Sequence, residues 1–350
     1  MAVTVSREVA AALQRGATVV LLARSQGSPE ALPGALAGVA WPPGLTHVSR
    51  PAPVPGGAVV LLDLGAAPTE QIPASMARAL EAAGLGDAVI EAPPVIGDRY
   101  AMAQAYGPAA RSWLRGPLSR VPSAGWLLDL AGVWLREHGP PTAVIISVEA
   151  PVAWPEVRPL ADAVLAAGHS VTFTAGDLSA GVTAAAVGHG YALAPEATLT
   201  TARPSGEKAA DALLEQREVL RSGASRLVWA GAAPTRTAGD FLLPRWTADE
   251  PGGRPDVTLL GDLAVPDALW YQILSPGHLD RLGGPPPDAV ELPDGRFELT
   301  LGEPEEWLPE CPDRLLLQAK GRELLAPCLL TPDEAFTLSR ERLHAVRDQR

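Results

Sequence analysis

Short, almost uninterrupted apolar runs are the feature that most constrains how this chain can fold. Residues 17–23, 58–64 and 143–148 are runs of this kind, and each is followed within a few residues by Gly, Pro or an acidic side chain. A strand that is covered on both faces is apolar throughout, as strands of parallel sheets tend to be. The runs therefore predict buried strands of a mainly parallel sheet.

Segments with helical spacing separate these runs. The expected helices cover residues 6–15, 73–83, 123–138, 155–167, 205–222 and 266–274. Further strands are expected at residues 87–91, 170–174, 226–230 and 257–260, and a loop at 25–57. Alternation of strands and helices favours an α/β fold with a mainly parallel sheet flanked by helices. An open doubly wound sheet is the first choice and an α/β barrel the second.

The pattern changes after the Gly-Gly-Pro-Pro-Pro segment at 283–287. Residues 289–292 and 297–301 flank a Pro-Asp-Gly turn, and residues 315–319 and 323–326 flank Lys320-Gly321, so two hairpins are expected. Thr331 and Glu334 then form the capping box of a final helix. These signals predict an α/β body at 1–282, with a subdivision near 107–122, and a C-terminal α+β appendage rich in hairpins at 283–350.

The composition of the chain limits the cellular environments and the classes of partner that are expected. The formal charge is −12, from 28 Lys and Arg against 40 Asp and Glu, so nucleic acid and anionic lipid are unfavourable partners. With only two cysteines, Cys311 and Cys328, no disulfide framework is expected. No apolar run reaches the roughly 18 residues of a membrane span. A soluble protein of the cytoplasm is the expectation.

Acidic side chains close several expected strands. They are Asp63, Glu91, Glu149, Asp177 and Asp262. Ligands of parallel sheets bind at the carboxyl ends of the strands, so Glu149 and Asp177 are candidate acid/base residues, together with His189 between two glycines. The alternative is that these residues only end strands and cap helices.

A second candidate site lies at the start of the helix expected at 205–222. Arg203, Ser205, Gly206 and Lys208 could hold an anion there, because free backbone N–H groups and the helix dipole favour negative charge. The alternative is that Ser205 is an ordinary N-cap and Lys208 a solvated side chain.

The sequence lacks the common motifs that identify a reaction or a cofactor. The sequence has no Walker motif, no Gly-x-Ser-x-Gly elbow, no dinucleotide-binding glycine motif and no His/Cys spacing typical of zinc ligands. No metal site is therefore predicted, and no cofactor can be named. His278, in Ser-Pro-Gly-His, is interpreted as a turn or capping residue.

Two functions remain open at this point, and whether the chain is an enzyme is one of the open questions. The favoured hypothesis is a non-catalytic scaffold or interaction protein, which meets a protein partner or a second copy through its C-terminal region. The alternative is an enzyme that acts on a small anionic or sugar-like substrate at the carboxyl ends of the parallel strands.

Overall fold

The structure is a computed structural model. It describes residues 2–15, 17–54, 56–93, 109–118, 124–138, 143–146, 161, 165, 170–187, 192–202, 207–235 and 257–348. The chain divides into two compact units, Met1–Met102 with Pro140–Ala175 and Ala103–Gly139 with Gly176–Arg350.

The sheet of the first unit is built around β2 (Thr18–Arg24). Both neighbours of β2, which are β5 (Gly57–Asp63) and β6 (Val89–Glu91), run antiparallel to it. The order is β1-β6-β2-β5-β3, and β4 also pairs with β5. The three short strands are β1 (Thr4–Val5), β3 (His47–Val48) and β4 (Ala52–Val54). Of the pairs described here, only β1 with β6 is parallel.

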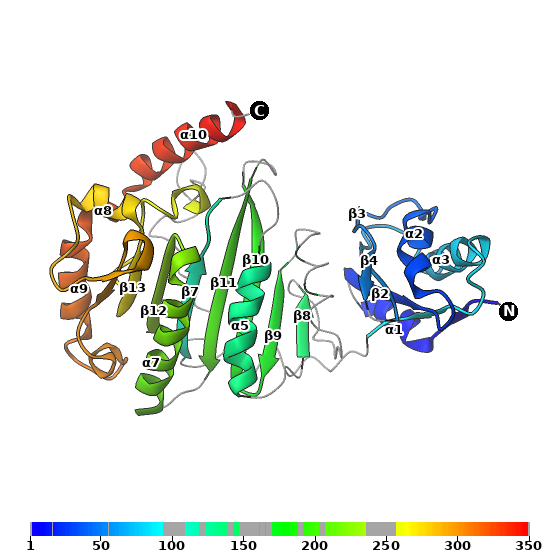
Figure 1. Cartoon of the computed structure of the whole chain (residues 1–350), viewed down its shortest axis with the longest axis horizontal. Helices are drawn as coiled ribbons and strands as arrows, with labels where there is room; N and C mark the ends of the chain where they lie inside the picture. The colour runs from blue at the N-terminus through cyan, green and yellow to red at the C-terminus, as the bar shows by residue number, and fades with distance from the viewer. Residues whose placement is uncertain are drawn as a thin grey trace. The chain divides into compact units, whose positions relative to one another are not determined.

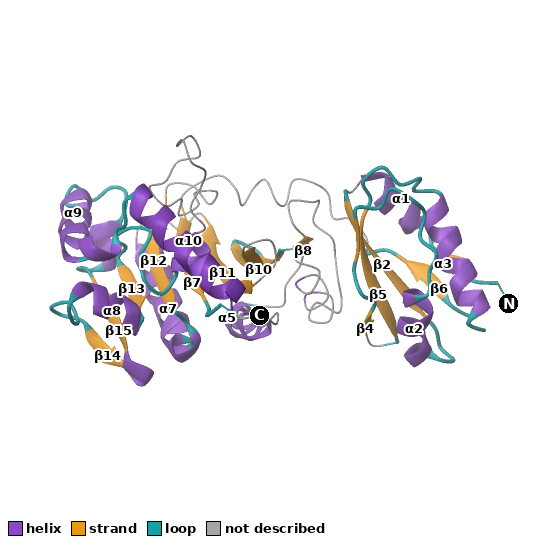
Figure 2. Ribbon diagram, turned by 90° about the horizontal axis from the view of Figure 1, so that it is seen from above, coloured by secondary structure: helices purple, strands orange, loops and turns teal. Residues whose placement is uncertain are grey.

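Three helices cover one face of this sheet, as Figure 2 shows. They are α1 (Arg7–Arg15), α2 (Leu32–Ala37) and α3 (Gln71–Ala82). Leu21 and Val60 of the sheet and Met76 of α3 belong to one buried apolar core. The segment expected as a loop at 25–57 contains α2 and the strands β3 and β4. The unit also includes an antiparallel pair, β8 (Ala143–Ile146) with β9 (Val171–Ala175).

Among the residues that the structure describes, the second unit has seven strands, all paired antiparallel, several of which are labelled in Figure 1. Their order is β14-β15-β13-β12-β7-β11-β10. Their bounds are β7 (Ala109–Arg115), β10 (Leu178–Val187), β11 (Ala192–Ala202), β12 (Trp229–Thr235), β13 (Tyr271–Leu274), β14 (Val290–Leu292) and β15 (Arg296–Thr300). The predicted hairpin around Pro-Asp-Gly is confirmed as β14 and β15.

Helices α5 (Gly125–Glu137) and α7 (Glu207–Ser222) lie on one face of this second sheet (Figures 1 and 2). Gln216 of α7 is fully buried and ties the helix to the sheet. Its Oε1 accepts from Ser112 Oγ at 2.6 Å, and its Nε2 donates to the Ala110 carbonyl at 3.2 Å and to Thr201 Oγ1 at 3.1 Å.

The remaining helices of the unit follow β13. They are α8 (Pro276–Leu282), α9 (Arg314–Leu324) and α10 (Pro332–Asp348). Short 3₁₀ turns complete the unit: η2 (Ala224–Arg226), η3 (Val257–Leu260), η4 (Pro293–Gly295), η5 (Pro304–Trp307) and η6 (Ala326–Cys328). The predicted capping box of the last helix is confirmed, because the Thr331 N–H donates to Glu334 Oε2 and the Glu334 N–H to Thr331 Oγ1.

The predicted mainly parallel sheet is wrong, and with it both the open doubly wound arrangement and the barrel. The described sheets are mostly or entirely antiparallel. In β2, Leu21 and Ala23 on one face and Val20 and Leu22 on the other are all buried. An apolar run indicates that both faces of a strand are covered, and this occurs in parallel and in antiparallel sheets. It does not indicate the direction of the neighbouring strands.

Three local predictions in the second unit are also wrong. Residues 257–260 form the 3₁₀ turn η3 instead of a strand, and the helix expected at 266–274 contains the strand β13. The hairpin expected around Lys320-Gly321 is the helix α9. Gly321 is buried in that helix, and a Cβ there would lie 2.5 Å from Leu301 Cδ1 and 2.9 Å from Ala268 Cβ. The glycine allows close packing of a helix and is not the centre of a turn.

We expect Gly321→Ala to destabilise the protein by about 1–3 kcal/mol, because the methyl group overpacks a filled space. Alanine's better helix propensity, about 1 kcal/mol, offsets only part of this cost. Gly132→Ala in α5 is the matched control, since its Cβ would meet nothing closer than Arg136 Nη1 at 3.5 Å. Urea unfolding should show a loss for the first variant and a small gain for the second. Equal gains would contradict the packing role of Gly321.

Candidate functional site

The structure describes two of the seven residues predicted to form a site. Asp177 is exposed in the turn between β9 and β10, and Lys208 is exposed in the first turn of α7. The Asp177 carbonyl accepts from the Ala202 N–H at 2.7 Å, at the end of the strand that leads towards α7. Outside the described residues lie Glu149, His189, Arg203, Ser205 and Gly206. The acid/base and anion sites therefore stay predictions.

Two strand-end carboxylates of the first unit have separate local partners. Asp63 Oδ1 accepts from Thr18 Oγ1 at 2.7 Å, and Glu91 Oε2 lies 3.3 Å from Arg24 Nε. Asp63 is in register with Thr18 and Glu91 with Leu22, so they are roughly 13 Å apart along β2. They do not form a working pair.

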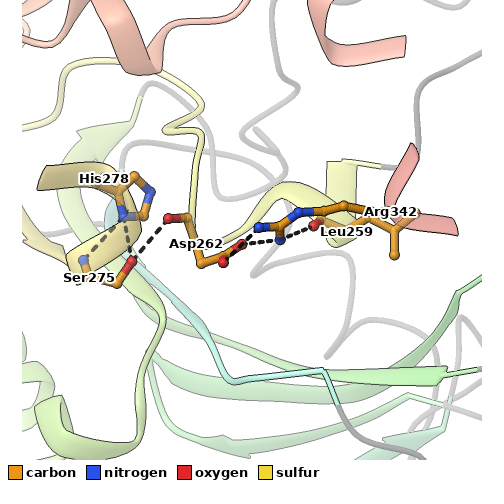
Figure 3. Close-up of polar contacts among 5 residues, drawn as sticks. All are labelled: Leu259, Asp262, Ser275, His278 and Arg342. Atoms are coloured by element: carbon orange, nitrogen blue, oxygen red, sulfur yellow. Dashed lines mark hydrogen bonds and ion pairs between the residues drawn. The ribbon is translucent and has the colours of Figure 1, made fainter. Parts of the chain in front are cut away.

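A group of reactive side-chain types, with a serine, a histidine and an aspartate, surrounds the start of α8 (Figure 3). Ser275 follows β13 as the N-cap of α8, and His278 is the third residue of the helix. Pro276 at the first helical position favours a helix start there. The serine Oγ lies 2.8 Å from His278 Nδ1 and 3.1 Å from the Asp262 carbonyl oxygen, and its single proton is shared between these two acceptors. Ser275 is 5% exposed and His278 0%.

The tautomer of His278 follows from these contacts. The Ser275 backbone N–H donates to Nδ1 at 3.1 Å, so Nδ1 carries the lone pair and the neutral ring carries its proton on Nε2. Nε2 is buried, and no atom of the described residues makes a hydrogen bond with it. Burial lowers the pKa of His278 to about 4, although the Ala264 carbonyl and Asp262 partly oppose this. The ring is therefore neutral at pH 7.

The carboxylate of Asp262 is committed to the C-terminal helix. Both of its oxygens are held by Arg342 of α10 in a bidentate ion pair, of which the Nη2 to Oδ2 distance is 3.0 Å. Arg342 Nη1 also donates to the Leu259 carbonyl at 2.8 Å. Cys328 of η6 also contacts α8, because its Sγ donates to the His278 carbonyl at 3.5 Å. Burial raises the pKa of the Cys328 thiol to about 11, so no thiolate forms at pH 7.

This arrangement contains a serine, a histidine and an aspartate but not a catalytic triad. In a triad the carboxylate orients one ring nitrogen while the other takes the serine proton. Here the Asp262 carboxylate contacts Arg342 instead of the ring, so Asp262 does not orient the imidazole. Both members of the Ser275–His278 pair are also closed to solvent. The cluster can cap α8 and connect it to α10, but it cannot present a nucleophile to a substrate.

The interpretation of His278 as a capping residue is confirmed. The signal was the serine three residues before it, at the spacing of a capping box. The link from Asp262 to Arg342 had no signal in the sequence, because 80 residues separate the two. In the parts of the chain that the structure covers, no three His, Cys, Asp or Glu side chains gather as metal ligands do. No helix in those parts is long and apolar enough to cross a membrane.

Comparisons with known proteins add no family. No family model matches the sequence, and no curated protein matches it. One solved structure, titled "putative glycine cleavage system transcriptional repressor", aligns with 63% of this chain and 98% of its own at 8% identity. The TM-score of 0.19 is too low to show a shared fold.

Proposed function

We propose that this protein is a non-catalytic interaction protein that binds a protein partner through its C-terminal region, residues 283–350. The observation that carries the proposal is the exposure of two adjacent leucines at the start of α9. Leu315 is 73% and Leu316 56% exposed, on an ordered helix packed against the rest of its unit. Exposed apolar groups that gather on one surface mark interaction sites more often than single ones do.

The other exposed large apolar side chains support this choice of region. Among the described residues they are Val5, Val133 and Val290. Val290 lies on the edge strand β14, also in the C-terminal region, whereas Val5 and Val133 are isolated on other elements. The Ser275–His278 pair has a structural explanation as the cap of α8.

The test is affinity capture with the full chain and two variants. Leu315→Ser/Leu316→Ser removes the apolar surface, and Val133→Ser removes an exposed apolar side chain from α5 of the same unit. All three proteins should unfold at similar temperatures, because the substituted side chains are exposed. At least one protein from a lysate of the source cells should bind to the wild type and to Val133→Ser but not to the double variant. Identical capture by all three would overturn the proposal.

A further inference from the structure

The segment that leads into α9 is rich in negative charge. Five exposed acidic residues lie between 303 and 313, namely Glu303, Glu305, Glu306, Glu310 and Asp313. Within residues 303–316 the one basic residue is Arg314, which is half-buried. Lys320, one turn beyond Leu316, is the nearest exposed cation on α9 itself.

The acidic segment is ordered and adjoins the helix. Trp307 of η5 is buried, and its Nε1 donates to the Leu301 carbonyl. Glu306 and Leu317 both pack beside Gly302, which places η5 against the first turn of α9. The Asp313 carbonyl accepts from the Leu317 N–H at 3.0 Å, directly below the exposed leucines. Leu315 and Leu316 therefore lie on an ordered helix whose first turn adjoins the acidic segment 303–313, which we call its acidic rim.

We propose that this surface, defined by Leu315, Leu316 and the acids of 303–313, docks a basic amphipathic helix of a partner protein. The inference rests on the proposed function and names the chemistry of its partner. Apolar side chains of such a helix would cover the leucines, while its Lys and Arg side chains would meet the acidic rim.

Charge argues against the other occupants of the surface. In a symmetric dimer the same patch meets itself, so acidic rims would face each other between two chains of formal charge −12. Anionic lipid and nucleic acid are repelled for the same reason. A basic protein segment satisfies both the leucines and the carboxylates.

The test uses two synthetic 18-residue peptides that share one leucine pattern at helical spacing. One carries Lys at its polar positions and the other Glu. Fluorescence anisotropy with the full chain should show binding of the Lys peptide only, weakened at least tenfold between 50 and 500 mM salt, as rim charges are screened. Leu315→Ser/Leu316→Ser should abolish the binding. Glu305→Gln/Glu310→Gln should weaken it several-fold.

A matched control separates the surface from the overall charge of the chain. Glu70→Gln/Glu137→Gln changes the net charge by the same amount at two exposed positions, the N-cap of α3 and the last residue of α5, and should leave the affinity unchanged. Equal weakening by both double variants would overturn the inference, as would binding of the Glu peptide or a dimer that the leucine substitutions dissociate. If the leucine variant loses its captured partner but the Lys peptide does not bind, the interaction function stands and the basic partner is wrong.

Discussion

Replacing Gln216 by leucine is expected to destabilise the second unit by about 3 kcal/mol, although leucine has nearly the same size. The fully buried Gln216 amide makes three hydrogen bonds, to Ser112, Ala110 and Thr201. Leucine would leave the buried Ser112 hydroxyl without a partner, at roughly 1–3 kcal/mol, and would also remove the donor to the Ala110 carbonyl and to Thr201 Oγ1. Urea unfolding followed by tryptophan fluorescence measures the loss, because Trp134, Trp229, Trp270 and Trp307 are buried in this unit.

A second substitution tests the cause of this loss. Ser112→Ala removes the hydroxyl that Gln216→Leu leaves without a hydrogen-bond partner. The double variant should therefore lose less unfolding free energy than the sum of the losses in the two single variants. A coupling of about 1 kcal/mol or more in this direction is expected. Strict additivity, or a Gln216→Leu variant as stable as the wild type, would show that these hydrogen bonds do not hold α7 on the sheet.

His278 is expected to make the protein lose stability as the pH falls from about 6.5 to about 4. Burial lowers the pKa of the folded-state ring to about 4, while an unfolded chain has a histidine pKa near 6.5. Between pH 6.5 and pH 4 the unfolded state therefore binds a proton at His278 that the folded state does not bind. The stabilisation is complete above pH 6.5, is lost on the way down to pH 4, and amounts to about 3 kcal/mol.

Two variants separate His278 from the many carboxylates that also titrate in acid. His278→Asn keeps an acceptor for the Ser275 N–H but does not ionise, so it should flatten the loss of unfolding free energy between pH 6.5 and 4. His344→Asn, at an exposed position of α10, should retain the full loss. The comparison concerns the slope with pH, because His278→Asn also leaves a small cavity. Equal slopes in wild type and His278→Asn would contradict the assignment.

Which segments are strands was partly predictable, and how they pair was not. The runs at 17–23 and 58–64 became β2 and β5, because segments in which nearly every residue is apolar have to be covered on both faces. Their antiparallel pairing depends on the route of the connecting segments. The hairpin of β10 and β11 has no such run, since its small residues alternate too weakly to give a signal.

Local signals failed where a distant contact decides the structure. Lys320-Gly321 has the composition of a turn, yet Gly321 lies in the helix α9. A glycine is needed there because Ala268 and Leu301 leave no room for a side chain. His278 was interpreted as a turn or capping residue, and the structure shows that its partner, Ser275, is only three residues away. Asp262 was expected at a strand end and instead binds Arg342, for which no local pattern exists.

The place of β7 has a consequence for synthesis on the ribosome. Of the seven strands of the second unit, β7 is synthesised first, yet its two neighbours, β11 and β12, begin only at residues 192 and 229. At about 5–20 residues per second, β7 has no permanent neighbour for several seconds, during which its backbone can pair with the wrong strand. A fragment that begins after residue 139 would lack the strand between β11 and β12 altogether. A truncation that removes the N-terminus as far as residue 139 should therefore yield an aggregating product and not a smaller domain.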